Sequence, residues 1–217
     1  MYIYLNHLSY FKSSYIVQNT QVQRTVAQND LWILVCKDLK WNCHVLAAAS
    51  KSNRMLGFIP RSTLEVKIQS TRKAFYTALV MSNLSYSSQV WAPQSVKLIE
   101  IIERVQQRAT KYTLSLPYST DISYKEKQRL TELIPLCYWH EYLDVVYTYK
   151  SIVNNTVAQF KISKPVRVTR RTASSKRVLL DIPKAKTVTF QNSFYSRASR
   201  TSNTLPEYLR DVRYQIY

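Results

Sequence analysis

A single glycine, Gly57, occurs in a chain of 217 residues. Tight turns and phosphate-binding loops need residues at positive φ, a conformation that glycine adopts most easily. A sandwich or barrel with many tight turns is therefore disfavoured, and so are the glycine-rich loops of the Walker and dinucleotide-binding types. Apolar residues make up 46% of the chain, which is enough to form a core. The expected fold class is mainly α, with a small N-terminal β-hairpin or strand piece, a helical bundle and a basic, partly irregular C-terminal arm.

The chain carries a formal net charge of +18, from 31 Lys and Arg residues against 13 Asp and Glu residues. A folded domain with so high a charge is best explained by a polyanionic partner. Nucleic acid is the first candidate and an acidic membrane surface is the second. A basic surface without a specific partner is the third interpretation. No run of about 18 apolar residues occurs, so no membrane-spanning helix is expected.

Three cysteines, Cys36, Cys43 and Cys137, do not form a disulfide framework and predict reduced thiols in an intracellular protein. The N-terminus lacks a basic segment followed by a long apolar run, so no secretory signal peptide is expected. Cys36, Cys43 and His44 are close in sequence, and Cys137 and His140 lie three residues apart. Two such pairs can form a Cys₂His₂ zinc site. Their spacing matches no zinc finger, and we expect packing roles and no metal site.

The N-terminal segment favours short strands. Residues 15–17 and 21–23 flank a polar triplet, which predicts a small hairpin. Residues 31–35 form an apolar run of the length of a buried strand.

The pattern becomes helical after Trp41. Asn42 is expected to cap a helix over residues 43–57, and Gly57 stands where a C-cap is expected. Pro60 is expected to block its continuation. A second helix should follow, with its cap at Ser62 or Thr63 and one apolar face formed by Ile68, Phe75 and Leu79.

The clearest helix is predicted over residues 95–114. Its apolar residues recur at spacings of 4, 3, 4 and 3 and form one stripe: Leu98, Ile102, Val105, Ala109 and Tyr112. A second stripe beside it is basic: Lys97, Arg104, Arg108 and Lys111. The basic stripe is either a solvated face or a surface that follows a phosphate backbone, and its four residues are candidate nucleic-acid-binding residues.

Two further helices are expected, a short one near residues 124–130 and a long one over residues 136–153. The long helix has apolar and aromatic residues at helical spacing: Leu136, Trp139, Leu143 and Val146, with Tyr142 and Tyr149 beside them. We interpret these rings as core or helix-packing residues rather than as platforms for base stacking.

Residues 161–200 contain many basic residues against one acid, Asp181. This composition predicts an extended, partly disordered arm with β-like pieces at 178–180 and 188–190. Cations interleaved with rings suit a single-stranded polynucleotide, whereas the alternative is a solvated tail. The candidate binding residues of the arm are Arg167, Arg170, Arg171, Lys176, Arg177, Arg197 and Arg200.

Five segments, in order, resemble LINE-type (jockey-like, non-LTR) retrotransposon reverse transcriptases. They are DLWILVCKDLKWNCH at 30–44, NRMLGFI at 53–59, LSYSSQVWAP at 84–93, IEIIERVQQRATK at 99–111 and NTLP at 203–206. In that family these segments follow the catalytic motif. The resemblance implies the end of the palm at residues 1–40, a thumb-like helical domain at 41–155 and a basic C-terminal region at 156–217. Trp32 stands where the family has glycine, and Ser202 stands where it has tryptophan.

The resemblance implies an RNA-directed DNA polymerase as the parent enzyme, which uses Mg²⁺ held by adjacent carboxylates. This chain contains no Asp-Asp pair, and its acids nearest that end, Asp30 and Asp38, lie eight residues apart. We therefore expect no catalytic residue, no cofactor in this chain and no activity of the chain alone. Expected partners are template–primer or target RNA or DNA and the missing catalytic palm, without a membrane, in the nucleus or the cytoplasm.

Two alternatives stay open. One is a stand-alone nucleic-acid-binding or scaffold protein derived from such an element. The other is a non-functional relic of the element, which the departures at Trp32 and Ser202 favour.

Overall fold

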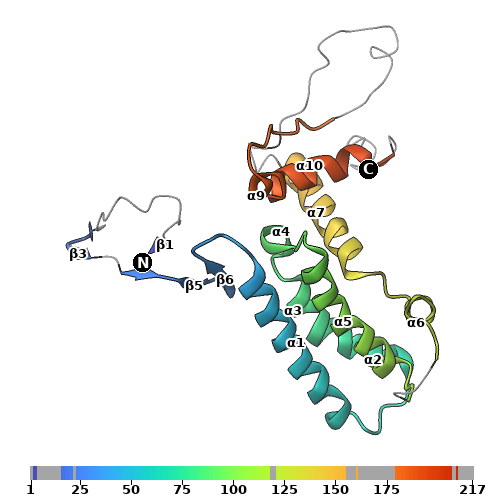
Figure 1. The fold of residues 1–217 in the computed structure, drawn as a ribbon. Coiled ribbons are helices and arrows are strands. Elements are labelled where there is room, and N and C mark those ends of the chain that lie inside the picture. The colour runs from blue at the N-terminus through green and yellow to red at the C-terminus, as the bar shows by residue number, and fades with distance from the viewer. Residues whose placement is uncertain are drawn as a thin grey trace, which may run out of the picture. The chain divides into compact units, whose positions relative to one another are not determined.

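The computed structural model describes residues 2–3, 16–21, 23–117, 121–154, 160, 179–206 and 209. Its described part is mainly helical with a little β-structure near the N-terminus, which confirms the predicted fold class (Figure 1). The chain divides into two compact units. The first unit consists of Met1–Ser87 and Trp91–Leu136, and the second of Ser88–Val90 and Cys137–Tyr217. The sequence instead suggested divisions at residues 40 and 155. The helix after Leu136 belongs to the second unit because its contacts, described below, are with the C-terminal helices.

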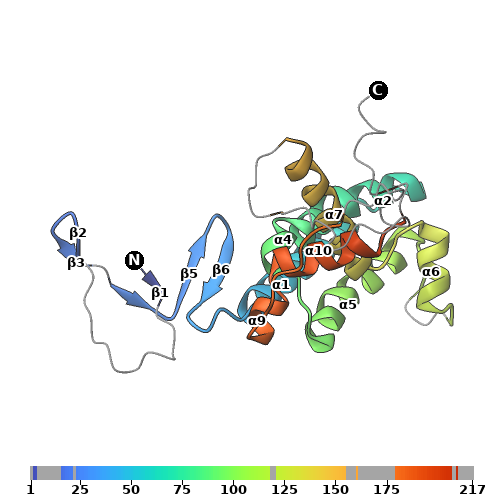
Figure 2. The ribbon, with the colours of Figure 1, turned by 90° about the horizontal axis from the view of Figure 1, so that it is seen from above.

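Within the described part of the chain, six short strands form three two-stranded pairings. Strands β1 (Tyr2–Ile3) and β4 (Arg24–Thr25) pair in parallel. Strands β2 (Ile16–Val17) and β3 (Thr20–Gln21) form an antiparallel hairpin, as the sequence predicts. The third pair, β5 (Ala27–Asp30) and β6 (Ile33–Cys36), is also antiparallel, as Figure 2 shows.

The turn between β5 and β6 changes one prediction. Leu31 and Trp32 form this turn at φ values of 46° and 67°, so the strand expected at 31–35 begins two residues later. Both turn residues have the left-handed conformation that two-residue hairpins require and that glycine adopts at least cost. Trp32 therefore occupies a position where its side chain strains the backbone.

Helix α1 spans Asn42–Ser62, so the prediction that it ends at Gly57 is wrong. Gly57 has no positive φ and lies on the exposed side of the helix. Pro60 lies inside the last turn, so the prediction that it blocks continuation is also wrong, although the helix ends two residues after it. The N-cap position is Trp41 rather than Asn42, and it makes no side-chain capping bond.

Three helical segments follow without a break: α2 (Gln69–Tyr76), the π-helix η1 (Thr77–Met81) and α3 (Ser82–Ser85). Their buried residues recur every four positions and include Tyr76, Val80 and Leu84. The predicted cap at Ser62 or Thr63 and the predicted face are both wrong, because the helix begins after Ile68, and Ile68 and Leu79 are exposed. A π-turn is wider than an α-turn, so a 3.6-residue period cannot be carried through it.

Helix α5 (Val96–Thr113) packs against α1 in the first unit (Figure 1). Its predicted apolar stripe is confirmed, because Ile102, Val105 and Ala109 are fully buried. Helix α6 (Tyr124–Thr131) begins after Ser123, whose hydroxyl accepts from the N–H of Glu126 at 3.2 Å.

Glu103 of α5 fixes the segment that carries α6. Its carboxylate accepts from the Tyr124 hydroxyl at 2.5 Å and from the Leu136 N–H at 2.9 Å. Burial raises the pKa of Tyr124, and the bond to Glu103 raises it further. Tyr124 therefore stays protonated and continues to donate.

The second unit contains α9 (Val188–Gln191) and α10 (Phe194–Thr204). It also contains the first three residues of α4 (Ser88–Trp91) and all of α7 (Leu136–Val153) except Leu136. The bounds of α7 match the prediction. The β-like piece expected at 188–190 is instead the short helix α9, capped by the Thr187 hydroxyl, which accepts from the Phe190 N–H at 3.2 Å. Part of the arm that the sequence predicted to be irregular is helical, namely α10. Arg197 of α10 pairs with Asp144 of α7, which holds this helix against the rest of the unit.

Candidate nucleic-acid interface

Cations from two helices line one hollow on the first unit, which we call the basic hollow. It encloses about 760 Å³. Its lining residues are Pro60, Arg72, Arg104, Gln107, Arg108, Lys111, Tyr112, Ser115 and Leu116. No acidic residue is among these described lining residues. The hollow therefore presents three guanidinium groups and one ammonium group.

The sequence predicted three of the four cations. Arg104, Arg108 and Lys111 are spaced by four and three residues on α5, which places them on one face. Arg72 comes from α2, and the sequence gave no reason to group it with the stripe on α5. Because helices α2 and α5 pack together, Arg72 reaches the same hollow.

Arg72 is held in a fixed orientation. Its Nε donates to the carbonyl of Val66 at 2.6 Å, and its Nη1 donates to the carbonyl of Tyr112 at 3.0 Å. Its guanidinium lies 5.3 Å from the centre of the Tyr112 ring, within the range of a cation–π contact. The Tyr112 hydroxyl is in turn 2.9 Å from the Thr63 hydroxyl. The charge of Arg72 is thus fixed in the wall.

The arginines on α5 are more loosely held. Arg108 Nη1 donates to Asn53 Oδ1 at 3.0 Å, a bond to a neutral amide. Arg104 Nη2 lies 3.7 Å from Glu100 Oε2, and both side chains are exposed. A surface pair of this kind contributes only about 0–1 kcal/mol, so Arg104 can exchange it for a phosphate at little cost.

The remaining predicted residues have other positions. Lys97 is exposed on α5 but does not line the basic hollow. Arg200 donates to the carbonyls of Ser196 at 3.2 Å and Gln191 at 2.5 Å. Arg197 is buried and paired with Asp144, so we omit it from the interface proposed below. Five candidates lie outside the described residues: Arg167, Arg170, Arg171, Lys176 and Arg177.

Cys36 and His44, which were considered for a zinc site, are buried. His44 Nδ1 accepts from the Leu34 N–H at 3.1 Å, and burial lowers the pKa of His44. Its ring meets the edge of Trp91 at 4.8 Å between ring centres. The neighbouring Cys43 thiol and burial raise the pKa of Cys36 to about 11. Among the residues that the structure describes, no group of three or more His, Cys, Asp or Glu side chains is placed to hold a metal.

The two acids near the expected palm end do not share a site. Asp38 Oδ1 accepts from the Lys40 N–H at 3.1 Å, a local turn contact. Asp30 ends strand β5 and is exposed.

Across the described ranges, no helix is both long and apolar enough to cross a membrane. No protein-family model, no curated protein and no solved structure matches the chain.

Proposed function

We propose that this chain is the thumb and C-terminal part of a LINE-type reverse transcriptase and that its basic hollow binds the sugar–phosphate backbone of RNA or DNA. The observation that supports this most directly is the convergence of Arg72, Arg104, Arg108 and Lys111 on one hollow without a lining acid. The five ordered motifs supply the polymerase class. Catalysis would belong to the missing palm, whose carboxylates hold Mg²⁺, and we assign no catalytic residue to this chain.

The chemistry of the hollow suits phosphate more than bases. Guanidinium groups donate two parallel hydrogen bonds to phosphate oxygens, and Arg72 is pre-oriented for such contacts. Tyr112 is the one ring among the described lining residues, and Arg72 already covers it. The hollow therefore favours backbone binding with little base readout, and its affinity should depend steeply on salt.

A fluorescence-anisotropy titration of the full chain tests this proposal. The probes are an RNA–DNA hybrid, duplex DNA and single-stranded RNA, each at several salt concentrations. If four cations each neutralise one phosphate, the logarithm of the association constant should fall with the logarithm of the salt concentration with a slope of about −3 to −4. A preference for the hybrid would support the thumb assignment. A binding constant that does not change between low and moderate salt would exclude binding of the phosphate backbone by these cations.

Charge reversal locates the binding site. Arg104→Glu with Arg108→Glu should weaken binding of all three probes and reduce the steepness of the salt dependence by about two. Lys40→Glu with Lys125→Glu is the matched control, because both lysines are exposed and neither lines the hollow. Equal losses in the two double variants would mean that only net charge matters and that the hollow is not the site.

Exposed apolar side chains on α1 favour a part of a larger enzyme over a stand-alone protein. Leu46 and Phe58 are both more than half exposed. Such residues commonly mark a surface that another part of the protein covers. We propose the catalytic palm as that part. An open reading frame for the palm directly upstream would support this, whereas an isolated spliced gene would favour the stand-alone alternative. A relic without selected function predicts that unfolding is not cooperative.

A further inference from the structure

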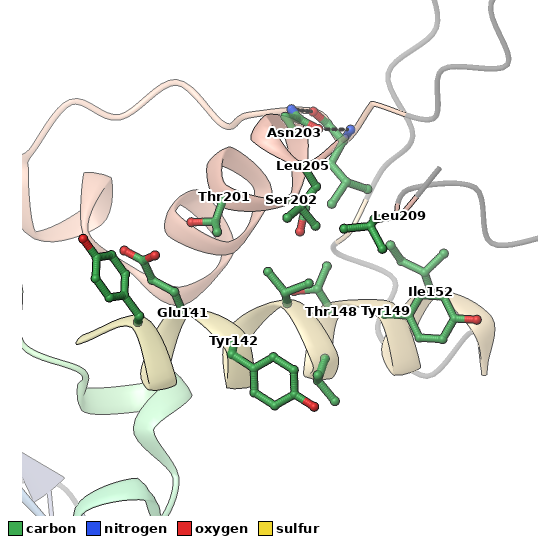
Figure 3. Close-up of a pocket in the computed structure, with 14 residues that line it drawn as sticks. Glu141, Tyr142, Thr148, Tyr149, Ile152, Thr201, Ser202, Asn203, Leu205 and Leu209 are labelled. Atoms are coloured by element: carbon green, nitrogen blue, oxygen red, sulfur yellow. Dashed lines mark hydrogen bonds between the residues drawn. The ribbon is translucent and has the colours of Figure 1, made fainter. Parts of the chain in front are cut away.

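A second hollow, which we call the apolar groove, lies entirely within the second unit. One wall is α7, which carries Thr148 and Ile152 on the side toward α10, and the other consists of the end of α10 with Leu205 and Leu209 (Figure 3). The groove encloses about 490 Å³, within the range of about 300–1,000 Å³ that is usual for small-molecule sites.

Tyrosine rings and aliphatic side chains make up most of the lining. The tyrosines are Tyr138, Tyr142 and Tyr149, and the aliphatic residues include Val145 and Val146. These rings were predicted to be core or helix-packing residues, and Tyr142 is not in the core: it is 53% exposed and stacks on Trp139 with 5.2 Å between ring centres. The periodicity of α7 could not reveal this, because tyrosine occurs on both buried and exposed helix faces. The rings therefore remain available to a ligand.

The wall at the end of α10 is held in place by hydrogen bonds within the protein. Asn203 Oδ1 accepts from the Leu180 N–H at 2.9 Å, and Asn203 Nδ2 donates to the Leu180 carbonyl at 2.9 Å, as the dashed lines in Figure 3 show. On α7 the Thr148 hydroxyl donates to the carbonyl of Asp144 at 2.8 Å. These lining polar groups are satisfied within the protein, which leaves an apolar surface of fixed shape.

Glu141 gives the groove its charge preference. Among the described residues that line it, Glu141 alone carries a charge at neutral pH, whereas the chain as a whole has a net charge of +18. A phosphate or carboxylate would meet this carboxylate, and none of the described lining residues supplies a cation to offset it. An amine would pair with Glu141, and tyrosine faces attract cations as well.

We infer that the apolar groove binds aromatic or aliphatic amines, with the apolar body between α7 and α10 and the ammonium group at Glu141. This inference does not rest on the proposed function, because the basic hollow belongs to the first unit and is tested with different probes.

Equilibrium dialysis of the full chain against 2-(2-naphthyl)ethylamine tests the inference, with 2-naphthylacetate as the anion of matched shape. The amine should bind at one saturable site, and the anion should bind at least several-fold more weakly. Glu141→Gln should weaken the amine by about threefold to fivefold, as expected for an exposed ion pair, and should reduce its advantage over the anion. Equal binding of amine and anion to the wild-type chain would overturn the inference, as would the absence of saturable binding.

Two variants locate the bound amine. Tyr142→Ala removes an exposed lining ring and should weaken binding, whereas Tyr86→Ala removes an exposed tyrosine of the first unit and should not. Ser202→Trp places a large ring at a lining position and should abolish binding. Its circular dichroism and thermal unfolding show whether it folds. If amine binding is the same in Tyr142→Ala and Tyr86→Ala, the amine does not occupy the groove.

Discussion

Arg197 and Asp144 form a buried, two-point ion pair inside the second unit. Arg197 Nε lies 2.6 Å from Asp144 Oδ2, and Arg197 Nη2 lies 3.3 Å from Asp144 Oδ1. Their side chains are only 9% and 2% exposed. The same guanidinium donates to the carbonyls of Asn192 at 3.2 Å and Gln89 at 3.1 Å. One side chain therefore joins α7, α10 and the short segment at Gln89, and the loss of either partner would leave a charge buried without compensation.

Arg197→Met should destabilise the second unit by about 3–5 kcal/mol, because Asp144 would remain charged and unpaired. Burial raises the pKa of Asp144, and Arg197 opposes that rise. The variant should raise this pKa further, so its folded state binds a proton more tightly than the wild-type folded state does. Acid should therefore reduce the difference in the free energy of unfolding between variant and wild type. Urea unfolding at neutral and acidic pH measures this difference.

Arg200→Met is the control for this ion pair. Arg200 belongs to the same helix but has carbonyl partners rather than a carboxylate. Its replacement should cost less, with no comparable pH dependence. A loss in Arg197→Met that is small and independent of pH would show that the pair is not a stabilising contact in solution.

Gly57→Ala should stabilise the first unit by about 0.5–1 kcal/mol, because glycine inside a helix costs conformational entropy. A Cβ at this position meets only Arg61 Nη2, at 3.6 Å, which is an ordinary contact. Ala47→Gly, at an exposed position of the same helix, should cause a loss of similar size. Thermal unfolding measures both. If Gly57→Ala destabilised the protein, residue 57 would not be an interior helix position.

Trp32→Gly should stabilise the β5–β6 hairpin relative to Trp32→Ala by about 1 kcal/mol, because alanine keeps the cost of a positive φ and glycine does not. The two variants lose the same ring, which is 78% exposed and lies 5.9 Å from Lys51 Nζ. Their comparison therefore removes the cation–π contact from the measurement. Amide hydrogen exchange at Val35, which pairs with Gln28 of β5, reports the stability of the hairpin. Equal exchange rates would mean that residue 32 is not left-handed in solution.

His44 should make the first unit less stable in mild acid. Burial lowers the pKa of His44 from its usual value of 6.5, so the unfolded chain binds a proton more readily than the folded chain. The contribution of His44 is therefore complete above pH 6.5 and is lost as the pH falls below it, by at most about 1.4 kcal/mol per pH unit. Protonation would also put a proton on Nδ1, which accepts from the Leu34 N–H.

Urea unfolding between pH 7.5 and 5.5 measures this effect of His44. His44→Gln provides the reference, because glutamine retains an acceptor and does not titrate in this range. The wild-type chain should lose more stability than this variant as the pH falls. Parallel losses would assign the pH dependence to other groups.

The sequence alone determined the elements whose signals are local. The 3.6-residue stripes over 95–114 and 136–153 correspond to α5 and α7, and three of the four cations of the basic hollow follow from the period of one helix. A stripe can be recognised before the chain folds because helix geometry fixes which of its residues share a face.

Tertiary structure decided the rest. Helix α1 continues past Gly57 because its buried face packs against α5, and packing can outweigh the weak preferences of single residues. Arg72 lines the basic hollow although it belongs to another helix than the basic stripe. Arg197, predicted to bind nucleic acid, instead pairs with Asp144, 53 residues away. A basic residue in sequence can become either a surface cation or a buried partner. Only the packed chain brings the carboxylate of Asp144 next to Arg197. Packing also buries both groups in low-dielectric surroundings, where a charge without a partner is costly.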